Sequence, residues 1–412
     1  MNTPIDKYYL DALKKYYIAS EDRRSKVVDF THNQMSPLLS GSEEITEDNA
    51  NFVIIDSFNG IKPVVLDYDF LTKGEKYVPI LAGIALDSQV VHYLHRFVTD
   101  QDGKFQSTTR GVCTRKLLQR IASYSKKGWD FNAFFYLAEA MSNNLSRGIF
   151  PHEHASGMSI LRLQTMDDDV FIRRGEIVPD PDKLDEYAER HHRASFDAVS
   201  AKIIATTISA GMLDGYKTQV LASYSALLKI GLLQYERCDT HTKLRRLFEF
   251  FHAQLGVFGL REAVVACLHF SGKSGKFIPI EKGARNVRQK LLASAWDLQL
   301  LRLPENIIAN ESLDHTSVYY VCTADKTLQR LGRMFAVHRV SSIESRDGHL
   351  PSAVSLRTDL IEEEVGEALT KTFDAECSQS MSRSGERSPK NFQQISAVVT
   401  KLEHQVIQLT KN

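Results

Sequence analysis

The pattern of hydrophobic and polar positions divides the chain into a strand-rich part and a longer helical part. Short runs rich in β-branched residues predict strands over 51–58, 62–70, 77–86 and 318–323. Apolar residues recurring every three or four positions predict helices over 90–99, 114–125, 131–144, 184–211, 217–231, 241–256, 260–270, 284–302 and 326–335. The pair Asn59-Gly60, between the first two strands, is typical of a hairpin turn. Three strands in succession, a long run of helices and one further strand between two helices predict an α/β protein.

The same pattern gives a domain organisation with one large central domain. Residues 1–50 read as a helical and loop segment, with an amphipathic helix over 5–20, and 51–340 read as an α/β domain. The run of helices at about 150–283 is interpreted as an insertion into that domain. Two polar stretches predict linkers, the acidic segment 166–182 and the longer segment 341–390. Residues 391–412 predict a final amphipathic helix.

Composition narrows the classes of protein to consider. The chain has 51 Lys and Arg and 51 Asp and Glu among 412 residues, so its net charge attracts neither nucleic acid nor basic partners. Five cysteines without a CxxC pair argue against a disulfide framework or a structural zinc site. There is no hydrophobic leader and no apolar stretch long enough for a membrane span, which predicts a cytoplasmic protein without a membrane partner.

Four carboxylates stand at positions where they could serve chemistry. Asp87 ends an apolar strand in IALDSQVV, and Asp325 follows another strand in VYYVCTADKTL. Glu139 and Asp297 are embedded in apolar helices, in YLAEAM and SAWDLQLL. A carboxylate inside an apolar element is costly unless it is paired, hydrogen-bonded or bound to a metal. If the four converged, their mutual repulsion would favour Mg²⁺ or Mn²⁺, which prefer oxygen ligands.

These four segments resemble the motifs of the PIN-like nucleases. That family has a strand ending in Asp, a Glu within a later helix, an Asp in an apolar helix, and a strand closing with Thr/Ser-x-Asp. Asp87, Glu139, Asp297 and Asp325 occur in this order, and Thr323 matches the hydroxyl residue two positions before the last acid. The first and last acids are separated by more residues than a compact PIN domain contains, which the helical insertion would explain.

The resemblance implies a fold, a site and an activity. The fold would be a PIN-like three-layer core with a central, mostly parallel sheet, the helical insertion and a C-terminal helix. Asp87, Asp297 and Asp325 would bind Mg²⁺ or Mn²⁺, with Glu139 and Thr323 completing the catalytic site. The implied activity is an endonuclease acting on RNA or single-stranded nucleic acid, in a family that includes toxins and RNA-processing enzymes. The basic residues at the start of the helix over 284–302, Arg285, Arg288 and Lys290, would contact the phosphate backbone.

Each acid also has a structural explanation. Asp87 and Asp325 precede helices and are typical of N-caps. Glu139 could pair with a neighbouring Lys or Arg, and Asp297 could be a hydrogen-bonded acid beside Trp296. The competing hypothesis for the whole chain is a non-enzymatic interaction protein. It would bind a regulatory partner or a second copy through its helical middle and the helix over 391–412.

Overall fold

A computed structural model gives the fold of the chain. It describes residues 13–15, 18, 26–30, 38–74, 78–144, 150–209, 212–275, 277–281, 283–310, 315–341, 352–356, 358–383 and 389–411. Residues 13–15 and 18 are helical, and the rest of the helix predicted over 5–20 lies outside the described residues.

The contacts among residues divide the chain into two compact units. Unit 1 consists of Met1–Ser209 and Arg302–Leu356, and unit 2 of Ala210–Leu301 and Arg357–Asn412. Neither unit is a continuous stretch of sequence, because the chain passes from one to the other three times. These divisions do not coincide with the boundaries predicted at residues 50, 340 and 390.

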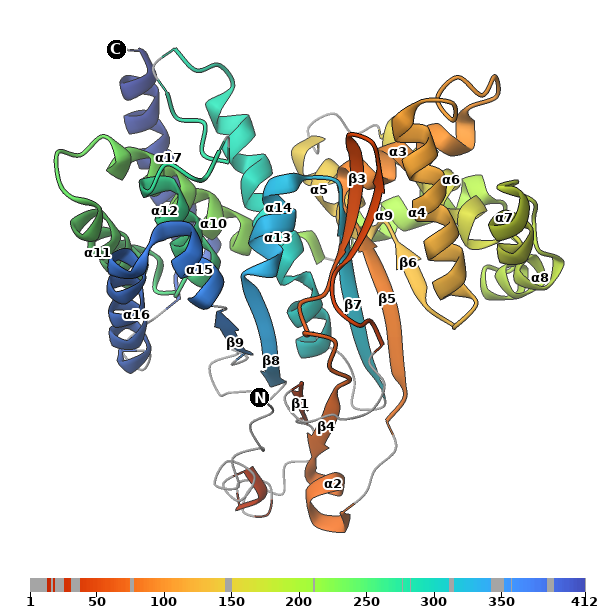
Figure 1. Cartoon of the computed structure of the whole chain (residues 1–412), viewed down its shortest axis with the longest axis horizontal. Helices are drawn as coiled ribbons and strands as arrows, with labels where there is room; N and C mark the ends of the chain where they lie inside the picture. Colours follow the sequence, from red (N-terminus) through yellow and green to blue (C-terminus); the bar gives the residue numbers. More distant parts are fainter. Residues whose placement is uncertain are drawn as a thin grey trace. The chain divides into compact units, whose positions relative to one another are not determined.

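Unit 1 is built on a mixed five-stranded sheet. In spatial order its strands are β2 (Glu43–Glu47), β3 (Ala50–Ile55), β7 (Thr316–Thr323), β5 (Ile80–Leu86) and β6 (Asp130–Asn132). β5 pairs in parallel with both β7 and β6, whereas β3 pairs antiparallel with β7 and with β2. Figure 1 shows β3, β7 and β5 running beside one another. The predicted α/β class is confirmed, but the sheet expected to be mostly parallel is mixed because the β2–β3 hairpin completes one side.

A glycine on β5 makes room for a tyrosine ring on the neighbouring strand β7. Gly83 on β5 lies opposite Tyr319 on β7, and a Cβ at Gly83 would lie 2.5 Å from a carbon of the Tyr319 ring. Tyr319 then reaches Asp130 at the start of β6, to which its hydroxyl donates over 3.1 Å. The ring therefore crosses β5 and connects three neighbouring strands.

A second, antiparallel sheet completes the strands of unit 1. Its order is β4 (Val64–Asp67), β1 (Lys26–Asp29), β8 (Phe335–Ser341) and β9 (Ser352–Leu356). Asn59 and Gly60 do form a tight turn, with φ of 54° and 71°. The predicted hairpin is nevertheless wrong, because β3 and β4 on either side of the turn belong to different sheets. The strand predicted over 62–70 ends at Asp67, whose side chain caps helix α2 (Tyr68–Lys73).

Helices α3 (Ser88–Thr99) and α4 (Thr109–Ser125) cover one face of the five-stranded sheet (Figure 1). Their buried Leu94 and Leu117 belong to the same core as Ile84 and Leu86 of β5 and Tyr320 of β7. The other helices of this unit are α5 (Phe134–Asn144), α6 (Pro151–Gln164), α7 (Asp168–Arg174), α8 (Pro181–Arg190), α9 (Phe196–Ser209) and α14 (Lys326–Arg333).

Two predictions for this stretch need correction. The single helix predicted over 184–211 is broken between α8 and α9, where His192 and Arg193 have positive φ of 53° and 58°. The predicted acidic linker over 166–182 is ordered: Asp167 caps α7, and Met166 forms an isolated β-bridge with Pro179. Its acidic residues serve helix ends, where carboxylates accept from free backbone amides.

The regular elements in the described part of unit 2 are all helices, joined by loops. They are α10 (Met212–Gln234), α11 (Thr240–Phe250) with the π-helical turn η2 (Phe251–Leu255), α12 (Leu260–Phe270), α13 (Val287–Asn310) up to Leu301, α15 (Thr358–Val365), α16 (Glu367–Ser382) and α17 (Phe392–Lys411). The predicted linker over 341–390 thus contains β9, α15 and α16, and Ile361 and Phe373 are fully buried. In the described part of the chain, no helix is both long and apolar enough to cross a membrane.

Candidate active site at the ends of β5 and β7

The adjacent ends of β5 and β7 bring the first and last predicted acids into one place. Leu86 pairs with Cys322, and the Asp87 backbone N–H donates to the Cys322 carbonyl over 3.0 Å. Because parallel neighbours end at the same edge of a sheet, Asp87 directly after β5 meets Thr323 at the end of β7. This edge is the usual ligand-binding side of α/β sheets.

Thr323 is the residue that connects the two acids. Its hydroxyl donates to Asp87 Oδ2 over 2.7 Å and accepts from the Asp325 backbone N–H over 3.0 Å. Two residues of the Thr-x-Asp motif thus take part in one short network: Thr323 through its hydroxyl and Asp325 through its backbone N–H. Thr323 is fully buried, so the hydroxyl is held in this position by the sheet.

The two acids differ in how they use the helix that follows them. Asp325 caps α14, with Oδ1 accepting from the backbone N–H groups of Thr327 and Leu328 over 2.7 and 2.9 Å. Both cap bonds go to the same oxygen, so capping does not engage Oδ2. Asp87 occupies the N-cap position of α3 but forms no side-chain cap. The capping explanation therefore fits Asp325, whereas the backbone N–H groups of Ser88 and Gln89 lie close enough to the Asp87 carboxyl only to lower its pKa.

Glu139 joins the network from α5. The Ser88 hydroxyl, at the first position of α3, donates to Glu139 Oε2. Burial raises the pKa of Glu139 to about 7, and the nearby charge of Asp87 adds to the effect. Within the described residues no Lys or Arg forms an ion pair with this carboxyl, contrary to the structural explanation considered above.

Asp87 is the most deeply buried of these acids, with 5% of its surface exposed. Burial and, to a smaller extent, the charge of Asp325 raise the pKa of its carboxyl, while the Thr323 hydrogen bond lowers it. The resulting pKa is about 6. Two buried carboxyls with raised pKa values and no cationic partner are unfavourable in the ionised state. Such an arrangement is typical of a functional site rather than of a structural ion pair.

The donor chemistry of this group fits a hard divalent cation. Asp87, Asp325 and Glu139 offer carboxylate oxygens, and their charges lack compensation by Lys or Arg in the described residues. In the same described part of the chain, no group of three or more His, Cys, Asp or Glu side chains is placed so that it could hold a metal ion. Asp87 and Asp325 are the residues that could begin such a group.

The remaining predicted residues lie in unit 2. Asp297 is a partly buried residue of α13 and is not one of the acids that β5 and β7 bring together. Arg288 forms an ion pair with Glu403 of α17 at 2.9 Å, while Arg285 and Lys290 are exposed. The assignments of Asp297 to metal and of the three basic residues to nucleic acid stay predictions.

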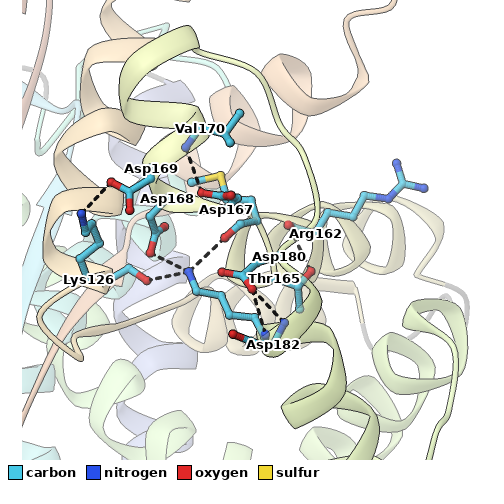
Figure 2. A network of polar contacts seen from close by, with 12 residues as sticks. Lys126, Arg162, Thr165, Asp167, Asp168, Asp169, Val170, Asp180 and Asp182 are labelled. Atoms are coloured by element: carbon cyan, nitrogen blue, oxygen red, sulfur yellow. Dashed lines mark hydrogen bonds and ion pairs between the residues drawn. The ribbon is translucent and has the colours of Figure 1, made fainter.

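A second acidic group in unit 1 provides a contrast (Figure 2). Asp168 forms an ion pair with Lys183 at 2.6 Å, and Asp169 forms one with Lys126 at 2.7 Å. The same Lys183 ammonium donates to the Met166 carbonyl over 3.0 Å. Here Asp168 and Asp169 each pair with a lysine, and Asp167 caps α7.

Sequence reasoning missed several residues around the candidate site. Ser88 directly follows Asp87, so its contact with Glu139 had a local signal in the order Asp-Ser at a helix start. Gln329 of α14 donates to the Thr323 carbonyl over 3.4 Å and accepts from the Asn51 amide over 3.0 Å. That contact joins residues 278 positions apart, and nothing in the local sequence points to it.

Comparisons of the chain with protein-family models, with curated proteins and with solved structures found no match.

Proposed function

We propose that unit 1 is a metal-dependent endonuclease with a PIN-like arrangement, which hydrolyses phosphodiester bonds in RNA or single-stranded nucleic acid. The observation that carries the proposal is the Asp87–Thr323–Asp325 network at the ends of two parallel strands, with Glu139 beside it. These are four of the five residues that the resemblance to PIN-like nucleases assigns to the site; the fifth, Asp297, belongs to unit 2. The mixed sheet is compatible with the proposal because the antiparallel strands lie on the side of β7 away from β5.

Each residue has a role that follows from its surroundings. Asp87 and Asp325 would hold Mg²⁺ or Mn²⁺ through their carboxylate oxygens. Thr323 fixes the orientation of Asp87 by donating to Oδ2, as a positioning residue. When bound, the metal supplies an activated water and stabilises negative charge on the phosphate.

Glu139 is suited to accept a proton from the attacking water. A general base works best when its pKa lies near the working pH, and burial raises the pKa of Glu139 to about 7. The Ser88 hydroxyl holds one carboxylate oxygen, Oε2, which leaves Oε1 for the proton.

The test measures cleavage of labelled single-stranded RNA and DNA by the full chain, with Mn²⁺, with Mg²⁺ and with EDTA. We expect cleavage only with a metal and its loss in Asp325→Asn. Asp169→Asn is the matched control, because it removes the same charge from an exposed acid elsewhere in unit 1. Equal cleavage by all three proteins would show that the activity does not come from this site.

Asp297→Asn belongs in the same assay, since its assignment to metal rests on the resemblance alone. We expect reduced cleavage, and unchanged cleavage would remove Asp297 from the proposed site. The interaction hypothesis stays the alternative, although the apolar face of α17, one of the surfaces it would use, packs on α10 within unit 2. Its buried residues are Ile395, Val399, Leu402 and Val406.

A further inference from the structure

Helix α4 carries several cations, and most of them are paired. Lys116 pairs with Glu47 and Arg120 with Glu43, both acids of β2, and Lys126 pairs with Asp169. Arg110, in the first turn of the same helix, has no carboxylate partner among the described residues. Arg115 of the same helix also has no carboxylate partner among the described residues but donates to the Gln106 side chain over 3.1 Å, so Arg110 is the cation considered for a ligand.

The Arg110 guanidinium is nevertheless held in a definite place. One N–H donates to the Asn51 carbonyl over 3.0 Å. The central carbon lies 5.2 Å from the centre of the Phe52 ring and 4.8 Å from that of Tyr93, distances typical of cation–π contacts. A guanidinium fixed in this way keeps further N–H donors and loses little freedom when it binds an anion.

Arg110 also lines a surface pocket. The other lining residues are Thr109 beside it and Asp48, Asn49 and Ala50 of the β2–β3 turn. Asp48 and Asn49 are exposed, so the pocket combines a positioned cation with groups that accept from, or donate to, the edges of nucleobases.

The pocket connects directly to the candidate active site. Val53 of β3 pairs with Thr323, so Asn51 lies two residues further along, beyond the end of β7 and on the side of Asp325. The Asn51 amide donates to Gln329, which in turn donates to the Thr323 carbonyl. Arg110, Asn51, Gln329 and Thr323 thus form a continuous chain of contacts within unit 1.

We propose that Arg110 binds a backbone phosphate of a single-stranded nucleic acid, at a nucleotide next to the bond cleaved at Asp87 and Asp325. This inference rests on the proposed function and names a substrate contact for it. Arg suits the role because its planar group donates two parallel hydrogen bonds to phosphate oxygens. A strand that reached from Asp325 to Arg110 would pass the β3 end of the sheet edge.

The experiment measures RNA binding separately from cleavage. The full chain carrying Asp325→Asn is titrated against a fluorescent single-stranded RNA without added metal, at several KCl concentrations. Arg110→Gln in this background is expected to weaken binding about tenfold and to reduce the salt dependence of log K by about 0.7, the effect of one phosphate contact on a single strand. Arg120→Gln is the matched control, because Arg120 also lies near a ring, that of Tyr124, but is paired with Glu43.

A merely structural role for Arg110 would change the melting temperature and leave the salt dependence intact. Arg110→Lys separates the two roles, since it retains the charge but not the planar group. We expect it to retain the wild-type salt dependence while binding about threefold more weakly. If Arg110→Gln does not fold, Arg110→Lys alone tests the proposal. An RNA affinity of Arg110→Lys equal to that of the wild-type residue would then contradict it.

The outcomes separate this inference from the proposed function. One outcome is that RNA binding depends on Arg110 while the wild-type chain cleaves nothing with metal. It would retain the phosphate contact at Arg110 and remove the proposed nuclease activity. The reverse outcome is metal-dependent cleavage by the wild-type chain together with equal RNA affinity of the Arg110→Gln and Arg120→Gln variants. It would retain the nuclease and remove the contact at Arg110. Absence of RNA binding by the parent protein would overturn the inference whatever the cleavage result.

Discussion

Unit 1 contains two groups of acidic residues that differ both in their sequence pattern and in their environment. The group Asp167–Asp169 forms a visible acidic run, and each charge meets a lysine or a helix N-terminus (Figure 2). Asp87 and Glu139 stand alone in apolar strings, and both are brought together without a cation. The acidic run stabilises the fold, whereas the isolated acids cost it stability. Charge compensation, rather than the density of acids, therefore distinguishes a functional carboxylate from a structural one.

The largest expected effect separates the two groups by activity. Asp87→Asn should reduce metal-dependent RNA cleavage at least about 100-fold, because it removes charge from a proposed metal ligand. Asp168→Asn should retain activity per folded molecule, since its carboxylate serves Lys183. Initial rates normalised to the folded fraction measure both. Similar losses in the two variants would end the distinction drawn here.

The next effect separates the two acidic groups by the free energy of unfolding, which should change in opposite directions. At pH 8, Asp87→Asn should raise the free energy of unfolding by about 2 kcal/mol, because it removes a buried charge that lacks a cation. Asp168→Asn should lower it by about 1–2 kcal/mol, since it leaves the largely buried Lys183 ammonium without its carboxylate. Denaturant unfolding gives both values. A destabilised Asp87→Asn would contradict the assignment of Asp87 as an uncompensated acid.

The pH dependence of that gain follows from the raised pKa of Asp87. The folded protein holds this proton up to a pKa of about 6, whereas the unfolded chain releases it near 3.8. The resulting stability is present below pH 3.8 and is lost as the pH rises through 6. The advantage of Asp87→Asn should therefore shrink to about half between pH 8 and pH 5. A gain independent of pH would have another cause.

A smaller effect concerns metal affinity. Burial raises the pKa of Asp87 to about 6 and that of Glu139 to about 7, so protons compete with a metal near neutrality. The affinity for Mn²⁺ should rise about tenfold from pH 6 to pH 8. Calorimetric titration measures it, with Asp87→Asn as the variant in which the rise is reduced. Tight, pH-independent binding in that variant would place the metal elsewhere.

The smallest effect tests the contact between Ser88 and Glu139. The hydroxyl hydrogen bond lowers the pKa of Glu139 against the effect of burial. Ser88→Ala should therefore raise that pKa, moving the pH midpoint of cleavage upward by less than about one unit. Ser88→Thr, which retains the hydroxyl, is the control. A midpoint unchanged in Ser88→Ala would exclude Glu139 as the group that controls the profile.

Local signals in the sequence were sufficient for much of the candidate site. A strand that ends on Asp87 and a strand that ends in Thr-x-Asp are both encoded within a few residues. Their meeting depends on β5 and β7 pairing over more than 230 positions, which no local pattern specifies. The α/β class was predictable from the presence of both strand-like and helical patterns, but the sheet to which each strand belongs was not. The turn at Asn59-Gly60 leads from one sheet into the other.

The missed helices have a different cause. α15 and α16 bury a few side chains, such as Ile361 and Phe373, and expose the rest, so their composition resembles a linker. The break between α8 and α9 depends on His192 and Arg193 adopting positive φ, which neither residue type requires. The contact chain from Arg110 to Thr323 is purely tertiary and could not be read from sequence at all.

The interleaved order of the two units has a consequence for the making of the protein. β7 is the central strand of its sheet, yet it is synthesised after nearly 100 residues of unit 2 have left the ribosome. Until residue 323 emerges, β3 and β5 lack the neighbour that joins them, and Asp87 lacks its hydroxyl partner. Pairing across such long separations is slow, and exposed strand edges persist meanwhile. A nascent chain would thus lack the contact between Thr323 and Asp87 for most of its translation, which would delay the activity proposed for this site.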